Sequence, residues 1–309
     1  MKLNGIHHIT AITGDALANV DFHTRVLGLR LIAKTVNQDD PGAYHLFYGD
    51  EHGSPGNDLT FFEYPGAISG RAGAGMVHRV VWRITSPDAF DFWADRVAGE
   101  GLPVTREDDG LIFASPEGLE HELVLDSSGD PPLRARHPEI PEELALAGFA
   151  GVRMYSLRPD ASVQVLEGVL EATPQPDDVW QLRGDRRGGT VQLDALPADR
   201  GIPGAGTVHH VAFYAPAAEH PQWPEVLRGA GLQPTPVIDR HYFHSIYFRE
   251  PGGVLYELAD DGPGFTVDQS LDQLGVKVIL PPWLESRRQQ IESHLTPIPD
   301  PRADWVTTS

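Results

Sequence analysis

Short runs of alternating hydrophobic and polar residues dominate this chain, and stretches with a helical period interrupt them. Residues 16 to 26 place Ala16, Val20, Phe22 and Val26 on one helix face, and residues 90 to 97 repeat that pattern. Runs rich in β-branched and aromatic residues predict strands at 44–48, 59–63, 111–114, 122–125, 180–182, 245–248 and 254–258. The pattern therefore predicts an α+β protein.

One strand-like phrase recurs along the chain, opening on a glycine and, in its best copies, leading to histidine. It begins at Gly5, Gly75 and Gly206, and a degraded copy begins at Gly148. In each copy a helical stretch and about three strands follow, so the repeated unit is βαβββ. We expect four βαβββ modules paired into two domains with cupped, mixed or antiparallel sheets.

A proline-rich link at residues 130–141 separates the second copy from the third. It divides the chain into an N-terminal domain of two modules (1–140) and a C-terminal domain of two modules (141–265). Residues 266–309 form a C-terminal extension, in which 283–294 predict a docked helix after two prolines.

Composition narrows the partners and the metal chemistry. The chain has 24 basic and 44 acidic side chains, a formal net charge of −20, which repels nucleic-acid backbones and anionic membranes and favours a small-molecule partner. It has no cysteine, so any metal is held by nitrogen and oxygen. The N-terminus has no apolar leader and no segment is apolar enough to span a membrane, so we expect a cytoplasmic protein. A homo-oligomer is compatible with the sequence.

The four copies differ at the two positions where chemistry could reside. At the second-histidine position they carry, in order, His8, Arg79, Val152 and His210. In the closing strand they carry Phe61 or Phe62, Glu122, Val191 or Leu193, and Glu257. If the first copy shares a sheet with the fourth, His8, His210 and Glu257 converge and the fourth corner is apolar. The other cup then lacks a ligand set, and Arg79 forms an ordinary ion pair with Glu122.

Two imidazoles and one carboxylate on three strands leave about three coordination positions open. This donor set suits non-haem Fe(II), which binds both O2 and a substrate oxygen. Mn, Zn, Co or Ni could occupy the same ligands in the purified protein.

The segment 239–253 concentrates polar rings just before the Glu257 strand. Tyr247 precedes Glu257 by one strand, a turn and a return, so its phenol is predicted beside the metal. Arg240 and His241 enter the same strand, where one would be an acid or anion-stabilising group and the other a surface side chain.

Residues next to the predicted ligands have both a packing and a functional interpretation. Strand alternation sends His7 and His209 to the face opposite His8 and His210, where they pack, orient a ligand or reach the substrate. Thr10 shares the face of His8, where it touches substrate or fills space.

Residues 245–257 are similar to the tail of the extradiol ring-cleavage signature, in which a tyrosine, an acidic-Pro-x-Gly turn and a ligand glutamate follow one another. The chain thereby resembles the vicinal-oxygen-chelate superfamily, which includes glyoxalases and extradiol dioxygenases. Segments 6–10, 44–50, 209–213 and 251–257 extend the resemblance to the hydroquinone ring-cleaving dioxygenases. His241 departs from the signature, because only four residues separate it from the aliphatic-Tyr pair. The resemblance implies the metal ligands His8, His210 and Glu257, surrounded by Arg240, Tyr247, His7, Thr10 and His209.

The first functional hypothesis is an Fe(II)-dependent dioxygenase that uses O2 to open a hydroquinone-type ring. The small aromatic substrate would bind through a phenol oxygen, and Arg240, His241 or Tyr247 would supply a proton. The second is a glyoxalase-type lyase or isomerase, which usually requires a fourth protein ligand to its metal. The third is a non-catalytic small-molecule-binding member of the same fold.

Overall fold

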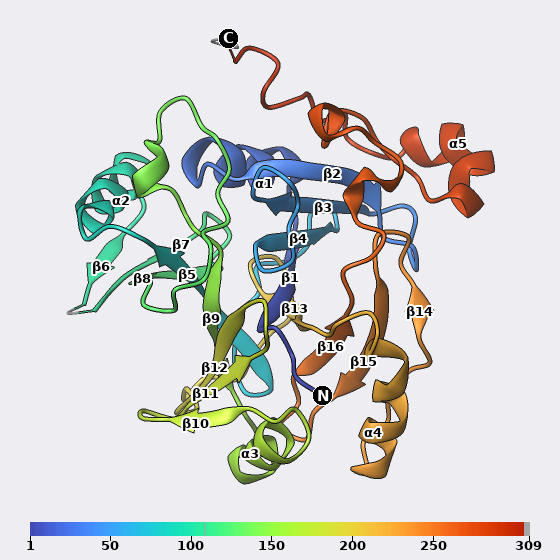
Figure 1. Cartoon of the computed structure of the whole chain (residues 1–309). Helices are drawn as coiled ribbons and strands as arrows, with labels where there is room; N and C mark the ends of the chain where they lie inside the picture. The colour runs from blue at the N-terminus through green and yellow to red at the C-terminus, as the bar shows by residue number, and fades with distance from the viewer. Residues whose placement is uncertain (108, 306–309) are drawn as a thin grey trace.

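The computed structural model describes residues 1–107 and 109–305, and it contains two eight-stranded curled sheets (Figure 1). The first has the strand order β14-β15-β16-β13-β1-β4-β3-β2, and the second β10-β11-β12-β9-β5-β8-β7-β6. The α+β class and the cupped sheets are therefore confirmed. The strands are β1 (Ile6–Thr13), β2 (Arg30–Val36), β3 (Tyr44–Gly49), β4 (Asp58–Glu63), β5 (Met76–Ile84), β6 (Val104–Arg106), β7 (Gly110–Ala114), β8 (Glu120–Leu125), β9 (Phe149–Tyr155), β10 (Thr173–Gln175), β11 (Val179–Arg183), β12 (Gly188–Asp194), β13 (Val208–Tyr214), β14 (Ile238–Asp239), β15 (His244–Arg249) and β16 (Leu255–Ala259).

The sheets join the first copy to the fourth and the second to the third. Within each copy the first strand runs parallel to the last. The two copies of each sheet join where β1 pairs antiparallel with β13, and β5 with β9. Each sheet thus contains strands from both sides of residue 140. The division into domains at 140 and 265 stays a prediction.

The glycine that opens each copy has a left-handed backbone. Its φ is +74° at Gly5, +81° at Gly75, +99° at Gly148 and +83° at Gly206. A Cβ atom at Gly206 would lie 1.9 Å from the carbonyl oxygen of Glu117, so a side chain is excluded there on two grounds. The recurring glycine in the sequence is thus a geometric requirement at the entrance to each first strand.

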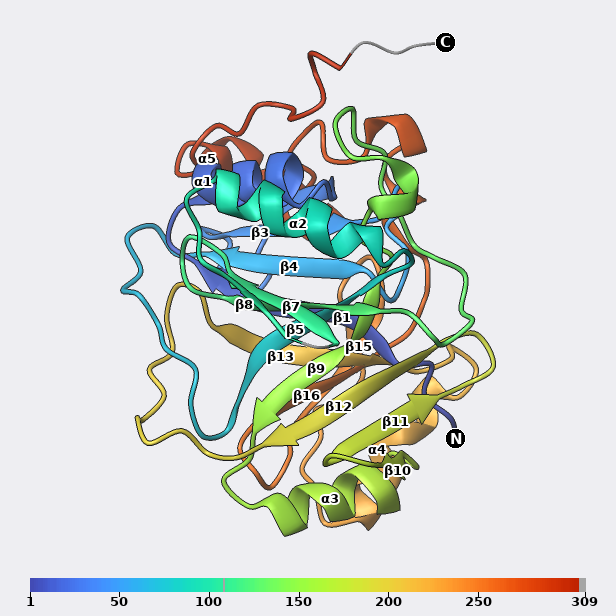
Figure 2. The same ribbon diagram turned by 90° about the vertical axis from the view of Figure 1, so that its left-hand side faces the viewer.

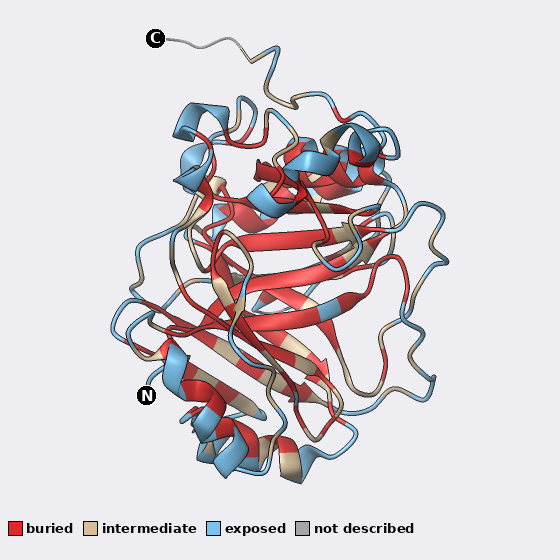
Figure 3. Ribbon diagram, turned by 90° about the vertical axis from the view of Figure 1, so that its right-hand side faces the viewer, coloured by how far each residue is buried: buried red, intermediate tan, exposed pale blue. Residues whose placement is uncertain are grey.

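Helices cover the two ends of the molecule. Figures 1 and 2 show α1 (Ala16–Asp21) and α2 (Asp88–Gly99) at one end, and α3 (Pro159–Gly168) and α4 (Trp223–Gly229) at the other. The strands are largely buried, whereas the helices expose their outer faces (Figure 3). In α2 the buried residues include Phe90, Trp93 and Val97, which confirms the predicted apolar face. The predicted helix at 16–26 ends in a π-helical segment, Phe22–Val26.

The C-terminal extension packs against the first copy. Lys34 Nζ donates to the carbonyl of Ile298 at 2.8 Å, and the Tyr44 hydroxyl donates to that of Thr296 at 2.9 Å. The predicted docked helix forms as 3-10 turns at Pro282–Arg287 followed by α5 (Arg288–Glu292). No helix in the described part of the chain is both long and apolar enough to cross a membrane.

Two buried histidines lie where the first helical segment meets the strands of the second copy. His23 and His121 are each no more than 1% exposed, and their ring centroids are 6.3 Å apart. The Nε2 atom of each has no hydrogen-bond partner among the described residues. Burial lowers the pKa of His23 to about 4, and burial followed by the nearby His23 lowers that of His121 to about 3.

Because of this histidine pair, we expect the folded protein to lose stability as the pH falls from 6.5 to 4.5. Below pH 6.5 these two histidines bind protons in the unfolded chain but stay neutral in the folded chain. The free energy of unfolding should therefore fall by about 1.4 kcal/mol per pH unit for each histidine. Urea unfolding of wild type and His121→Phe, both in chelator, measures this. The variant should show the shallower pH dependence, and identical slopes would contradict the assignment.

Candidate metal centre

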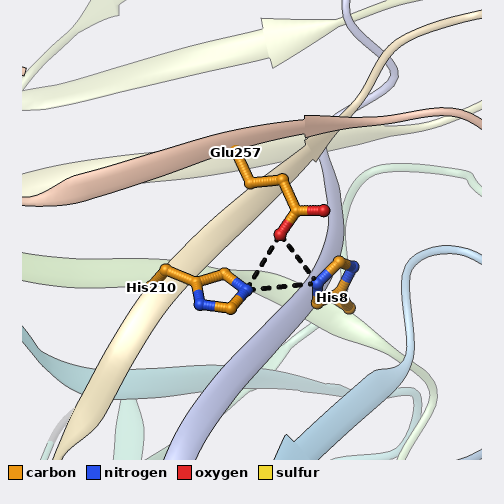
Figure 4. Close-up of side chains that lie close together, drawn as sticks. All are labelled: His8, His210 and Glu257. Atoms are coloured by element: carbon orange, nitrogen blue, oxygen red, sulfur yellow. Dashed lines mark hydrogen bonds and ion pairs between the residues drawn. The ribbon is translucent and has the colours of Figure 1, made fainter. Parts of the chain in front are cut away.

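Three side chains from three strands of the first sheet converge on one point. Glu257 Oε2 lies 2.9 Å from His210 Nε2 and 3.2 Å from His8 Nε2, and the two nitrogens are 3.4 Å apart (Figure 4). This triad is the group of potential ligands that comes together in the described chain. All three residues are at most 3% exposed. The structure thus brings together the three residues that the sequence nominated as ligands.

A small residue lets the triad form. His8, Ala212, Glu257 and Tyr247 lie in one row across β1, β13, β16 and β15. His8 and Glu257 are therefore two strands apart, about 10 Å along the row, and their side chains meet over the methyl group of Ala212. A residue with a longer side chain at 212 would occupy the space in which the ligands meet.

The histidines that precede the two candidate ligands are each the extra residue of a β-bulge. Ile6 pairs with Phe213 and His8 with Ala212, which leaves His7 without an opposite residue. On β13, Thr10 pairs with His210 and Ala11 with Val208, which leaves out His209. Regular alternation would turn both histidines to the far face, but a bulge re-aims the side chain. The expectation that they face away was therefore wrong.

The bulges fix the orientation of the candidate ligands. His7 Nδ1 lies 2.9 Å from His8 Nδ1, and His209 Nδ1 lies 2.8 Å from His210 Nδ1. When His8 and His210 carry their proton on Nδ1, each donates to its neighbour and keeps an Nε2 lone pair for the triad centre. Burial also lowers the pKa of His210, which favours the neutral ring that a metal requires.

The Glu257 carboxylate is an orphaned buried charge. It is 0% exposed, and neither oxygen has a hydrogen-bond donor among the residues that the structure describes, because the close imidazole nitrogens lack hydrogen-bond geometry. Burial alone would raise its pKa, but His8 and His210 outweigh burial and hold the pKa well below its usual range. A buried carboxylate that receives no hydrogen bond is unfavourable, and a cation placed between the three groups would stabilise it. These residues therefore fit a bound divalent cation, held by two imidazole nitrogens and one carboxylate.

The triad opens on a pocket lined by aromatic rings, which we call the front pocket. It holds about 440 Å3 including its mouth. Its lining consists of His8, Thr35, Asn37, Gln38, Asp39, His45, Phe47, Phe62, His210, Arg240, Tyr242, Phe243 and Tyr247. Rings on several sides suit a flat aromatic ligand.

Tyr247 and Arg240 meet at this pocket. Arg240 Nε donates to the Tyr247 hydroxyl at 3.3 Å, and its Nη2 donates to Asp39 Oδ2 at 3.0 Å. Burial, followed by the nearby Glu257 carboxylate, raises the pKa of Tyr247, so its phenol stays protonated. The pocket wall therefore offers a phenol O–H and a guanidinium beside the triad.

His45 lines the pocket and was not among the residues nominated from the sequence. His45 Nε2 lies 3.0 Å from Thr60 Oγ1, which lies 2.8 Å from Thr10 Oγ1. If Thr10 donates to Thr60 and Thr60 donates to His45, both hydroxyl protons of this buried series of hydrogen bonds have an acceptor. The opposite direction would strand the hydroxyl proton of Thr10, which is 0% exposed. His45 thus presents an Nδ1–H donor to the pocket.

The charge state of His45 is equally constrained. Burial, followed by the imidazoles of His8 and His210, holds the pKa of His45 well below its usual range. It therefore stays neutral. A lone histidine within a strand gives no sequence signal of this role, although the 44–50 segment that contains it was already part of the family resemblance.

Four nominated residues do not line the front pocket. His7 packs against Phe243 and Tyr214, and Thr10 is enclosed beside Thr60. His209 is exposed and lines a different pocket. The backbone of His241 has a φ of +74°, and its Nε2 lies 2.6 Å from Asp268 Oδ2, so its ring is paired outside this pocket.

The strand register corrects the fourth corner of the site. Glu257 pairs with the residue two positions after His210, and the residue two positions after His8 is Thr10, which pairs with Thr60. The counterpart of Glu257 is therefore Thr60 and not Phe61 or Phe62. The Thr60 hydroxyl is already hydrogen-bonded to His45.

The second cup carries charges that neutralise one another. Glu122 Oε2 lies 3.1 Å from Arg79 Nη1 and 3.2 Å from Arg153 Nη1. This confirms the predicted ion pair of Arg79 with Glu122. A carboxylate held by two guanidinium groups has no surplus charge for a metal.

The chain is similar to known proteins along most of its length. A model of the Glyoxalase/Bleomycin resistance protein/Dioxygenase superfamily matches residues 5–123. The protein named ring-cleaving dioxygenase MhqO, of Bacillus subtilis, is 40% identical over 96% of this chain and 97% of its own length. The protein named chlorohydroquinone/hydroquinone 1,2-dioxygenase, of Sphingobium indicum, is 32% identical over 94% of this chain and 95% of its own.

Solved structures agree on the fold. A crystal structure titled as a dioxygenase from Bacillus subtilis has a TM-score of 0.90 and 38% identity, with 96% of this chain and 98% of that chain covered. Glyoxalase I from Zea mays shares the fold at a TM-score of 0.57 and 17% identity, with 83% and 92% covered. The chain belongs to the glyoxalase and dioxygenase superfamily, within the group of relatives that carry ring-cleaving dioxygenase names.

Proposed function

We propose that this protein is an Fe(II)-dependent dioxygenase that opens the ring of a hydroquinone-like aromatic. One observation carries the proposal: the orphaned Glu257 carboxylate and two imidazole nitrogens, within 3.4 Å of one another, lie at a pocket lined by aromatic rings. The names of the relatives support the same reaction class.

The donor set favours iron over other metals for this chemistry. His8, His210 and Glu257 would hold the ion and leave positions open on one side. When bound, Fe(II) supplies the one-electron chemistry that allows O2 to react with an aromatic ring. The protein holds the ring beside the ion, so the reaction needs no further encounter between solutes.

The residues of the front pocket would position the substrate and manage protons. Phe47, Phe62 and Phe243 would enclose the ring and exclude water. The Tyr247 phenol, polarised by the Arg240 guanidinium, is the proton donor nearest to the triad in the strand register. Arg240 contributes through Tyr247 and through its own N–H groups. The contact of His241 with Asp268 makes His241 the weaker candidate for proton donor.

His45 would recognise a second ring oxygen. His45 lines the pocket from β3, while the triad lies on β1, β13 and β16, and with Nε2 accepting from Thr60 its Nδ1–H would be free to face the ligand. A para-diol bound to the metal through one oxygen carries its other oxygen across the ring. A rigid, neutral N–H donor is suited to that oxygen and would discriminate a diol from a simple phenol.

A redox-neutral isomerase is the alternative in the same fold. It usually requires a fourth protein ligand, and Thr60 offers no carboxylate or imidazole at that corner. The third alternative, a non-catalytic binding protein, would hold aromatics without consuming O2.

Replacing Glu257 by Gln should abolish both iron binding and oxygen consumption. The amide removes the buried negative charge that the cation neutralises, so metal affinity should fall more than about tenfold. Metal content after anaerobic reconstitution with Fe(II), and oxygen uptake with hydroquinone, measure the two effects. Glu122→Gln, at the matching position of the second cup, is the control and should retain both. Retained iron and turnover in Glu257→Gln would refute the site.

Enlarging Ala212 should disturb the triad without removing a ligand. In Ala212→Leu the new side chain would lie between His8 and Glu257, so metal affinity should fall about tenfold or more, with roughly 1–3 kcal/mol of lost stability. Metal content and thermal unfolding of the purified variant test this. An Ala212→Leu protein that folds and binds a full complement of iron would contradict the described row of residues.

Replacing His45 by Leu should reduce discrimination between diols and phenols. Binding to Zn(II)-loaded protein, followed by calorimetry without turnover, should show hydroquinone affinity falling about tenfold while phenol affinity changes little. Nitrogen-15 spectra of histidine-labelled protein should show His45 with its proton on Nδ1. Equal losses for both ligands would assign His45 a packing role.

A further inference from the structure

A second pocket continues along the same face of the first sheet, past the triad. It holds about 1100 Å3 including its open mouth, and we call it the rear pocket. Arg249 follows Tyr247 by two residues on β15, and Leu255 precedes Glu257 by two on β16, so each lies on the triad's face roughly 7 Å further along its strand. His210 lines both pockets.

The contacts across the boundary between the pockets are close. His209, which lines the rear pocket, bonds to His210 and packs edge-on against Phe62 of the front pocket, with ring centroids 5.6 Å apart. His210, which lines both pockets, and the contact of His209 with Phe62 therefore mark the boundary between them.

The rear pocket is positively charged within a strongly acidic protein. Its charged lining residues are Arg200 and Arg249, and its lining contains no carboxylate, although the chain carries a net charge of −20. Neither guanidinium forms an ion pair with a carboxylate of the described residues, whereas Arg240 of the front pocket is paired with Asp39. Arg249 uses Nη1 for the carbonyl of Gly253, at 2.6 Å, and keeps further N–H donors.

The remaining walls are apolar. The apolar lining residues are Met76, Val77, Leu157, Val254 and Leu255, together with Ile12, Ala74, Pro203 and Val208. Guanidinium groups bind carboxylates through paired N–H donors, and apolar walls favour a hydrocarbon body. The lining thus matches a small organic carboxylate.

We propose that the rear pocket binds a small organic carboxylate and that this ligand is the ring-opened product. The second part rests on the proposed function. Cleaving the bond between a hydroxyl-bearing ring carbon and its neighbour, with both atoms of O2 incorporated, turns the first carbon into a carboxyl group and the second into an aldehyde. The substrate is neutral, but the carboxyl group loses its proton at neutral pH.

The change of charge gives the two pockets different ligands. The front pocket, where Asp39 neutralises Arg240, suits the neutral diol. The rear pocket offers two unneutralised guanidinium groups to the anion, which the net negative charge of the protein would otherwise repel. Product would thus leave the triad on the side opposite to substrate entry.

Calorimetric titration with trans,trans-muconate, a stable six-carbon dicarboxylate, tests the site on Zn(II)-loaded and metal-free protein. Arg200→Gln and Arg249→Gln should each weaken binding about tenfold, and the double variant more. Arg228→Gln is the matched control and should bind as wild type does, since Arg228 is an exposed arginine on α4 that lies outside both pockets and forms no ion pair with the described residues. Phenol, the probe for the front pocket, should not compete with muconate.

Muconate affinity unchanged in the double variant, or muconate displaced by phenol, would overturn the rear pocket as an anion site. Oxygen uptake with hydroquinone separates this proposal from the proposed function. Arginine-dependent muconate binding without any oxygen uptake would leave the anion site standing and refute the product assignment. Normal oxygen uptake with muconate binding indifferent to both arginines would refute the anion site alone.

Discussion

The antiparallel pairing of β1 with β13 is the contact on which the site depends. It joins the first module to the last, so that His8 and His210, 202 residues apart in the chain, face one point. The parallel pairing of β13 with β16 then adds Glu257. Each of these three candidate ligands lies on an interior strand of the sheet, so strand pairing and not a loop holds it in place.

Paired bulges refine what the ladder provides. An extra residue in β1 and another in β13 bring His7 and His209 to the side of the following histidines. The second sheet has the same irregularities, which leave out His78 on β5 and Ala150 on β9. The bulges thus belong to the repeated module, and the candidate metal centre lies in the sheet where a histidine follows each bulge. In the second cup Arg79 occupies that position and forms ion pairs with Glu120 and Glu122.

The first cup distributes charge differently from the second. There the buried Glu257 carboxylate faces two imidazole nitrogens and lacks a hydrogen-bond donor among the described residues, an arrangement that a bound cation would stabilise. Around it, Arg240 is balanced by Asp39, whereas Arg200 and Arg249 are unbalanced beyond His210. The charge thus varies along one face of a single sheet, from the compensated Arg240 at the mouth, through the candidate metal centre, to the two uncompensated arginines.

The sequence by itself determined the βαβββ module, its four copies and the three residues that would converge if the first copy shared a sheet with the fourth. It could do so because glycine, histidine and glutamate recur at positions that the repeat places in register, and because the second and third copies carry Arg79 and Val152 where the first and fourth carry a histidine. Only the tertiary structure decided the neighbours of these residues. A one-residue bulge reverses the facing of His7 and His209, and cross-strand register puts Thr60 at the fourth corner and His45 in the pocket wall. A left-handed backbone turns His241 to Asp268. Such outcomes depend on how strands from distant copies pair, and that pairing leaves no local trace in the residues themselves.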